Sequence, residues 1–112
     1  MKHTDLTYLK ELSNGSNEFV KEMLSIFIKE MPEAISKIET HLQKKEWQLL
    51  RGVLHKIKPS ITFVGLKEIE EVVKDAEEYA GSQTNLDKLP EMIMKIKTTC
   101  TEGIHELQEE LK

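Results

Sequence analysis

The chain contains few cysteine, glycine, proline and aromatic residues. Its 112 residues include one cysteine, five glycines and three prolines, and aromatic residues make up 5% of it. A lone cysteine, Cys100, cannot form an internal disulfide, and so little glycine and proline argues against a fold built mainly of turns. With 32% charged and 38% hydrophobic residues, the composition excludes a disordered chain and favours helix.

The sequence also lacks a long hydrophobic run and a strong excess of basic charge. No apolar stretch reaches about 18 residues and no segment has the order of a signal peptide, so we expect a cytoplasmic protein without membrane insertion. Sixteen basic against twenty acidic residues leave a net charge of -4, which argues against nucleic acid as a partner. The length predicts one domain, 1–112, able to bury roughly two thirds of its unfolded surface.

The spacing of apolar residues predicts helices throughout the chain. Apolar positions recur every three or four residues, and strand-like alternation is missing. Pro32 interrupts the second helical pattern without shifting its phase, which favours one kinked helix over two separate ones. The expected helical ranges are 5–12, 17–42, 47–64, 66–80 and 89–111.

Short polar segments separate these helices and supply their ends. Ser16 is the expected N-cap of the second helix, and Gly81 is expected to close the fourth in a left-handed conformation. The segment from Thr84 to Asp87 has the spacing of a loose capping box before the last helix. Because the connections are short, consecutive helices should run antiparallel. The predicted fold is an all-α, up-down-up-down four-helix bundle with an additional short N-terminal helix.

His55 is the polar residue most suited to chemistry. It lies in the third helical pattern on the side away from the apolar stripe, so we expect its imidazole to face solvent. An exposed imidazole is a neutral nucleophile near neutral pH. Small residues leave its approach open, and cations lie within reach. The neighbours on that side of the helix are Arg51, Gly52, Lys58, Pro59 and Thr62.

The segment that begins at His55 resembles the histidine-containing phosphotransfer domains of two-component phosphorelays. Their signature is His-x-x-Lys-Gly, with a second glycine ten positions after the histidine, and His55, Lys58 and Gly65 match it. The Met-Pro-Glu interruption of the second helix and Trp47 ahead of the motif are also similar to the family. The resemblance covers essentially the whole chain.

The resemblance implies a role for each matched residue. His55 would be the phosphoacceptor, and the Lys58 ammonium would stabilise charge on the phosphoryl group during transfer. The partner would be the receiver domain of a response regulator or hybrid sensor kinase. Receivers hold the magnesium ion, so we expect no metal site and no cofactor in this chain. The residues expected to dock the receiver are Arg51, Gly52, Lys56, Pro59 and Thr62.

Two residues depart from the family pattern: Ile61 replaces a usually small residue and is expected to pack inward, and Pro59 is the departure that matters for the site. Pro59 stands where the family has glycine, and a proline four residues after His55 cannot donate a backbone hydrogen bond to its carbonyl. We therefore expect a local kink, with the approach to the imidazole still open. Gly65 has two open interpretations, a helix terminator or a position of close packing.

The remaining polar and reactive residues have simpler interpretations. His3, at an N-terminus expected to fray, is predicted to be a surface residue, as are His41 and His105. The acidic pair Glu77-Glu78 is predicted to lie on a solvated helix face. Cys100, in phase with the apolar stripe of the last helix, is predicted to be a core residue.

These observations predict a phosphorelay intermediate that accepts a phosphoryl group on His55 and passes it to another response regulator. The chain has no glycine-rich nucleotide cradle, so we expect no ATP-dependent kinase activity. One alternative is a non-catalytic helical adaptor that binds receivers. Another is the dimerisation domain of a kinase, which predicts a homodimer, whereas four helices in one chain predict a monomer.

Overall fold

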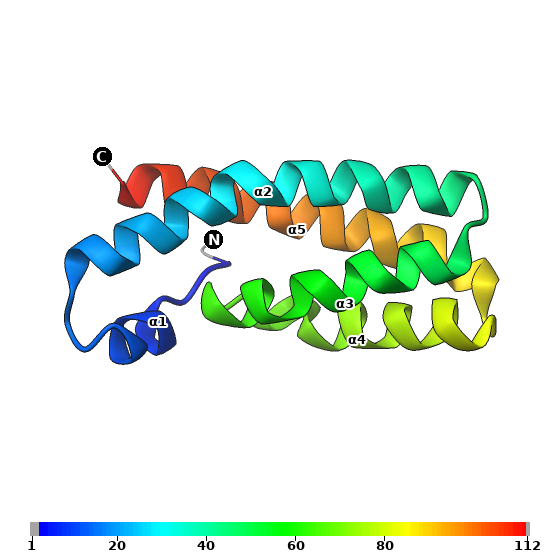
Figure 1. Cartoon of the computed structure of the whole chain (residues 1–112), viewed down its shortest axis with the longest axis horizontal. Helices are drawn as coiled ribbons and strands as arrows, with labels where there is room; N and C mark the ends of the chain where they lie inside the picture. Colours follow the sequence, from blue (N-terminus) through cyan, green and yellow to red (C-terminus); the bar gives the residue numbers. More distant parts are fainter. Residues whose placement is uncertain (1–2, 112) are drawn as a thin grey trace.

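The computed structural model describes residues 3–111, and four long antiparallel helices dominate it (Figure 1). A short helix, α1 (Thr7–Leu12), precedes them, and a 3-10 turn, η1 (Leu86–Lys88), leads into the last. No strand occurs within the described residues, so the predicted all-α class is confirmed. The long helices are α2 (Asn17–Gln43), α3 (Trp47–Phe63), α4 (Lys67–Ser82) and α5 (Leu89–Glu110).

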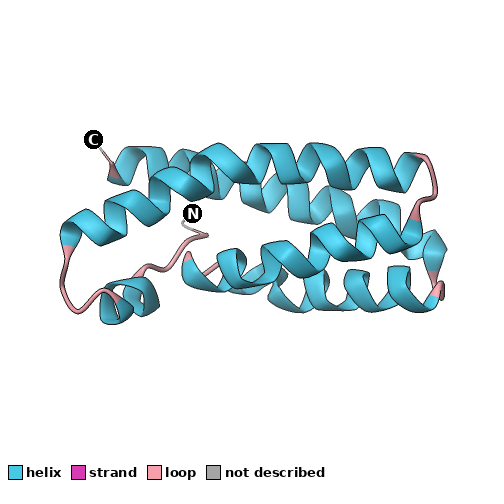
Figure 2. Ribbon diagram, viewed as in Figure 1, coloured by secondary structure: helices cyan, strands magenta, loops and turns pink. Residues whose placement is uncertain are grey.

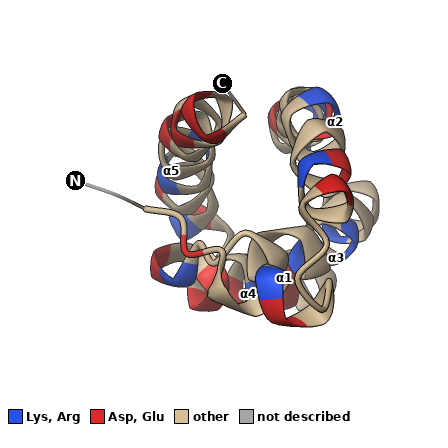
Figure 3. Ribbon diagram, turned by 90° about the vertical axis from the view of Figure 1, so that its left-hand side faces the viewer, with Lys and Arg blue, Asp and Glu red and all other residues tan. Residues whose placement is uncertain are grey.

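The four long helices form a closed ring of neighbours. Each packs on the helices before and after it in the chain, and α2 also packs on α5. Connections are confined to the ends of the bundle (Figure 2), and an end-on view places α2 and α5 on either side of the α3–α4 pair (Figure 3). This arrangement confirms the predicted up-down-up-down bundle with its additional N-terminal helix.

The apolar stripes predicted from spacing meet in one core. Each long helix directs its stripe inward, and burial of these side chains supplies most of the driving force for folding. Cys100 is among the core residues, and burial raises the pKa of its thiol to about 12. Its thiol is therefore an inert core group, as predicted.

Helix α2 begins and continues as the sequence indicates. The Ser16 hydroxyl accepts a hydrogen bond from the backbone N–H of Phe19 at 3.3 Å, which satisfies one of the free donors of the first turn. The helix continues through Pro32 to Gln43 as one element. Helix α3 likewise continues through Pro59.

The connection between α4 and α5 differs from the prediction. Gly81 was expected to close α4, but the helix extends to Ser82 and Gln83 takes the left-handed conformation at φ 55°. The predicted capping box is also wrong: Asn85 precedes the 3-10 turn and Lys88 precedes α5, neither makes a side-chain cap, and the Thr84 hydroxyl pairs with that of Ser82. Gly81 serves packing instead: a Cβ there would lie 2.7 Å from Cδ of Arg51.

The N-terminal segment packs on the turn between α3 and α4. The backbone N–H of Asp5 donates to the carbonyl of Val64 at 3.0 Å. Gly65 follows with φ +70°, and a Cβ at that position would lie 2.1 Å from the carbonyl oxygen of Asp5. Both interpretations of Gly65 therefore hold, because it ends α3 and also allows the close approach of another backbone.

No helix within residues 3–111 is long and apolar enough to cross a membrane.

We predict that Gly65→Ala destabilises the fold more than Gly15→Ala. Both glycines have positive φ, so each alanine costs about 1–2 kcal/mol of backbone strain. A Cβ at Gly15 meets no atom within 4 Å, whereas one at Gly65 meets the Asp5 backbone. Urea denaturation should therefore show that Gly65→Ala lowers the free energy of unfolding by about 1–3 kcal/mol more than Gly15→Ala does. Equal losses would mean that the close approach to Asp5 contributes nothing.

Candidate functional site

His55 lies near the middle of α3 and faces solvent. Its side chain is 69% exposed, as its phase in the sequence predicts. The opposite side of the same helix is buried through Leu54 and Ile57. A helix anchored on its inner face thus presents the imidazole outward, where a large partner can reach it.

A carboxylate on the neighbouring helix holds His55. Oε1 of Glu77, in α4, lies 2.7 Å from Nδ1 of His55. The other oxygen, Oε2, accepts a hydrogen bond from Nζ of Lys58 at 2.9 Å. One carboxylate therefore joins the two residues that the sequence singles out, although neither bonds directly to the other.

Glu77 was predicted to lie on a solvated face, and this is wrong. Its side chain is 13% exposed, because α4 packs against α3 at this position. Burial alone raises the pKa of its carboxyl, but the hydrogen bonds from Lys58 and His55 outweigh burial and hold that pKa below its ordinary value. Glu77 is therefore an anion at neutral pH, with both oxygens occupied.

The contact with Glu77 defines which ring nitrogen of His55 is free. An ionised carboxylate can only accept hydrogen bonds, so Nδ1 of His55 must carry the proton. In the neutral imidazole the lone pair then resides on Nε2. The site thus combines an exposed nucleophilic nitrogen with a cation, Lys58, whose flexible stem is anchored one helical turn away.

The other predicted site residues are exposed but divide between two sides of α3. Arg51 and Thr62 lie toward α4, where Arg51 packs against Gly81 and the Thr62 hydroxyl donates to Oε1 of Glu70 at 3.0 Å. Gly52 and Lys56 lie toward α2. Pro59 is exposed on the same helix, and Gly52 has nothing within 4 Å of an added Cβ. The surface beside His55 is therefore open on the side of Gly52 and lined by polar contacts on the side of α4.

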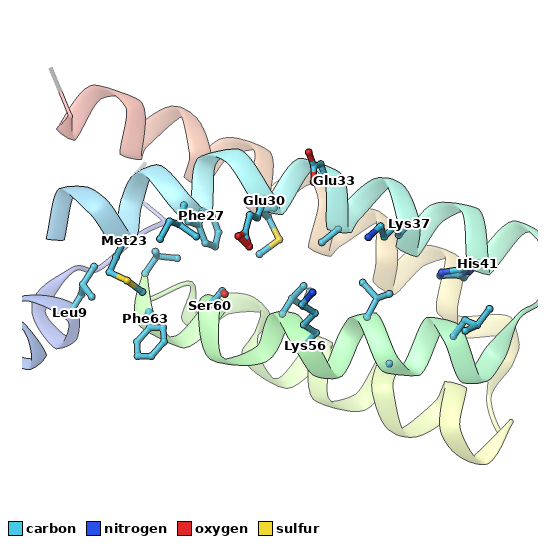
Figure 4. Close-up of a pocket in the computed structure, with 18 of the residues that line it drawn as sticks. Leu9, Met23, Phe27, Glu30, Glu33, Lys37, His41, Lys56, Ser60 and Phe63 are labelled. Carbon is cyan, nitrogen blue, oxygen red and sulfur yellow. The ribbon is translucent and has the colours of Figure 1, made fainter. Parts of the chain in front are cut away.

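A mainly apolar groove separates α2 from α3 beside this surface. It has a volume of about 630 Å³ and extends from Leu9 to His41 (Figure 4). Leu49, which is 55% exposed, and Ile26 belong to its lining. Figure 4 shows Glu30 of α2 and Lys56 of α3 projecting into the space between the helices. The groove continues directly from the surface that carries Gly52.

Two of the other three histidines differ from the prediction. His105 is exposed as expected. His41 is half-buried, and its Nδ1 lies 3.0 Å from Oε1 of Glu46. His3 is 14% exposed and contacts Glu68 and Glu102 through its ring, so it is half-buried against α4 and α5. Within residues 3–111, no group of His, Cys, Asp and Glu is arranged to hold a metal ion.

Glu77 is the functional residue that sequence reasoning missed. It lies 22 positions after His55 on another helix, so no local motif includes it. Its one signal is its position at the edge of the α4 stripe, between buried Ala76 and Ala80. A carboxylate beside two small buried residues indicates a place where a neighbouring helix approaches closely.

Comparison with known families agrees with this geometry. The family model described as "Hpt domain" matches residues 22–111, which is most of the chain. The chain belongs to the Hpt domain family. It is a phosphotransfer domain of phosphorelays, and no curated protein sequence matches it significantly.

A solved Hpt domain has the same fold. The crystal structure of the domain from the Hpt sensor hybrid histidine kinase of Shewanella superposes with a TM-score of 0.84. The match covers 97% of this chain and 93% of that one, at 18% sequence identity. The arrangement of helices is therefore shared although most residues differ.

We predict that Glu77 controls the tautomer of His55. Nitrogen-detected NMR at a pH where the ring is neutral should show the wild-type proton on Nδ1. In Glu77→Ala, the population with the proton on Nε2 should rise, because a hydrogen bond of about 1.5–3 kcal/mol to a charged group is lost. Glu78→Ala, one residue away on an exposed position, is the matched control. An unchanged tautomer in Glu77→Ala would contradict the assigned role.

Proposed function

We propose that Nε2 of His55 accepts a phosphoryl group from an aspartyl phosphate on one receiver domain and then passes it to another receiver domain. The observation that carries this proposal is the exposed imidazole whose Nδ1 is held by Glu77. The opposite nitrogen is thereby left with a lone pair directed away from the bundle. The chain acts as a carrier and not as an ATP-using kinase.

The transfer step follows from this arrangement. The Nε2 lone pair attacks the phosphorus atom, the bond from phosphorus to the aspartate oxygen breaks, and the aspartate leaves as a carboxylate. The ring, which keeps its proton on Nδ1, becomes positively charged as the N–P bond forms. The Glu77 carboxylate at 2.7 Å from Nδ1 stabilises that charge, as a carboxylate stabilises the imidazolium of a hydrolase triad.

Lys58 supplies the complementary charge. Its ammonium rests on Glu77 at 2.9 Å and is half-exposed, so the side chain can turn toward a phosphoryl group on Nε2. Negative charge spread over the phosphoryl oxygens favours that move. The magnesium ion of the reaction belongs to the receiver in this proposal, and the Hpt domain contributes the nucleophile and Lys58.

The groove between α2 and α3 is the apolar part of the proposed docking surface, and its occupant is the receiver that carries the aspartyl phosphate. A stable interface covers about 800 Å² on each partner, so a receiver centred on His55 must also cover a neighbouring helix. On the side of α3 that faces α4, the surface carries the charged residues Lys74 and Glu78. On the side that faces α2, it carries the exposed apolar residues Ile26 of α2 and Leu49 of α3. Apolar side chains suit the dry centre of an interface.

Incubation with a phosphorylated receiver tests the transfer. We expect acid-labile, alkali-stable label on the wild-type chain and none on His55→Gln. Lys58→Ala should accept label about 10²-fold more slowly, because a charge that stabilises the transition state is lost. Lys95→Ala is the matched control, since Lys95 is exposed on α5, diagonal to α3.

Retention of label in His55→Gln would place the chemistry elsewhere. Receivers that bind the wild type but never transfer label to it would instead support the adaptor interpretation. A dimer in solution would favour a kinase dimerisation domain, whereas we expect a monomer.

Leu49→Ala tests the docking surface. Loss of a large exposed apolar side chain in the groove should weaken receiver binding about tenfold, as at the centre of other interfaces. Met94→Ala removes an equally exposed apolar side chain from α5 and is the control. Titration calorimetry with an unphosphorylated receiver measures both. Equal affinities for the two variants would show that the receiver does not cover the groove.

A further inference from the structure

The N-terminal segment ahead of α1 is bound across one end of the bundle by an unusual set of contacts. Glu106 of α5 accepts hydrogen bonds from the backbone N–H groups of His3 and Thr4 and from the Thr4 hydroxyl. Thr4 is 5% exposed. Asp5 pairs with Lys67 at the start of α4 at 3.5 Å. The segment therefore connects α4 to α5 without belonging to either.

The ring of His3 lies between two carboxylates from different helices. Its Nδ1 contacts Oε1 of Glu68 in α4, and its Nε2 contacts Oε2 of Glu102 in α5. The ring is 14% exposed, whereas the two glutamates are about half-exposed. The imidazole is thus the enclosed centre of the cluster and the glutamates form its rim.

This geometry requires a particular protonation state. A neutral imidazole has one N–H donor and one lone pair, so it can satisfy only one carboxylate. The second carboxylate would then face the lone pair of the other ring nitrogen. Both contacts are favourable only when both ring nitrogens carry protons.

We propose that His3 is a pH-sensitive clasp: its imidazolium joins Glu68 of α4 to Glu102 of α5, and loss of its proton loosens the N-terminal segment from the bundle. The proposal is independent of the chemistry at His55. It concerns a conformational equilibrium of the segment 3–6 and of α1, which follows it.

The electrostatics agree with the proposal. The hydrogen bond to Glu68 raises the pKa of His3; burial opposes this, but the charge of Glu68 and the contacts with Glu102 add to the rise. Because the pKa of His3 is higher in the folded state than in the unfolded state, protonated His3 stabilises the fold, and this contribution is complete below the unfolded pKa of 6.5. It is lost as the pH rises through the higher pKa of the folded state.

Two carboxylates beside the segment, Glu106 and Asp5, have pKa values below their ordinary range. Burial raises the pKa of the Glu106 carboxyl, but the hydrogen bonds from Thr4 and His3 outweigh it and keep that pKa below its ordinary value. Hydrogen bonds from Thr7, and then the charge of Lys67, likewise lower the pKa of Asp5. Both stay ionised while His3 loses its proton, so the anchor on Glu106 remains available and the change is confined to His3, which loses one of its two carboxylate contacts.

The segment leads directly into α1, which gives the clasp a structural consequence. Leu6 and Leu9 are buried, and Leu9 also lines the end of the groove between α2 and α3. Tyr8 stacks on Phe63 at the end of α3, with ring centroids 6.1 Å apart. A loosened clasp should therefore increase local opening of α1 and expose this end of the groove.

Nitrogen-detected NMR of the full chain between about pH 5 and pH 9 tests the protonation state directly. We expect His3 to carry protons on both ring nitrogens below pH 6.5 and to titrate above that value. In the double variant Glu68→Gln and Glu102→Gln, the midpoint should fall toward that value. A wild-type midpoint at or below 6.5 would overturn the proposal.

Amide hydrogen exchange tests the release. After correction for intrinsic rates, protection of residues 4–9 should fall severalfold as the pH rises through the His3 midpoint. His3→Gln should remove this pH dependence, whereas His105→Gln, at an exposed position on α5, should retain it. The same pH dependence in His3→Gln as in the wild type would also overturn the proposal.

Discussion

The site depends on one half-buried carboxylate placed beneath an exposed imidazole. A surface histidine alone rotates freely and exchanges its proton between two nitrogens, so neither nitrogen is a consistent nucleophile. The Glu77 carboxylate removes both freedoms because it accepts from Nδ1 at 2.7 Å while Lys58 holds its other oxygen. The cost of burying its charge is offset by these two charge-assisted hydrogen bonds.

That contact depends in turn on how α3 and α4 pack. Glu77 reaches His55 because α4 packs along α3, and it stands in α4 between two small buried residues, Ala76 and Ala80. Gly81 extends the same close contact to Arg51. Helix α3 therefore has three functional sides: one in the core, one against the polar residues of α4, and one along the apolar groove that it shares with α2. His55, the proposed phosphoacceptor, lies where the two outer sides meet.

Much of this architecture could be predicted from apolar periodicity, because one stripe per helix and short connections leave few alternatives to an antiparallel bundle. The exposure of His55 and the burial of Cys100 follow from the same phase argument. Contacts between distant positions could not be predicted. Glu77 and His3 are predicted from the sequence as surface residues because their partners lie on helices far away in the chain.

The local errors have similar physical causes. Gly81 has the composition of a helix terminator, but it lies inside α4, where the absence of a Cβ leaves room for the Arg51 side chain. Gln83 takes the left-handed conformation that ends the helix. Gly65 is the opposite case, since the conformation that the sequence suggests and the close contact with Asp5 occur together. Glycine thus marks a constraint in sequence without showing which constraint it is.

In the proposed transfer, Glu77 directs the reaction to one nitrogen of His55. The most direct measurement is phosphorus and nitrogen NMR of the phosphorylated chain, which distinguishes a phosphoryl group on Nε2 from one on Nδ1. We expect a phosphoryl group on Nε2 of His55, with the proton retained on Nδ1. A phosphoryl group on Nδ1 would contradict it, because that nitrogen would then have lost its hydrogen bond to Glu77.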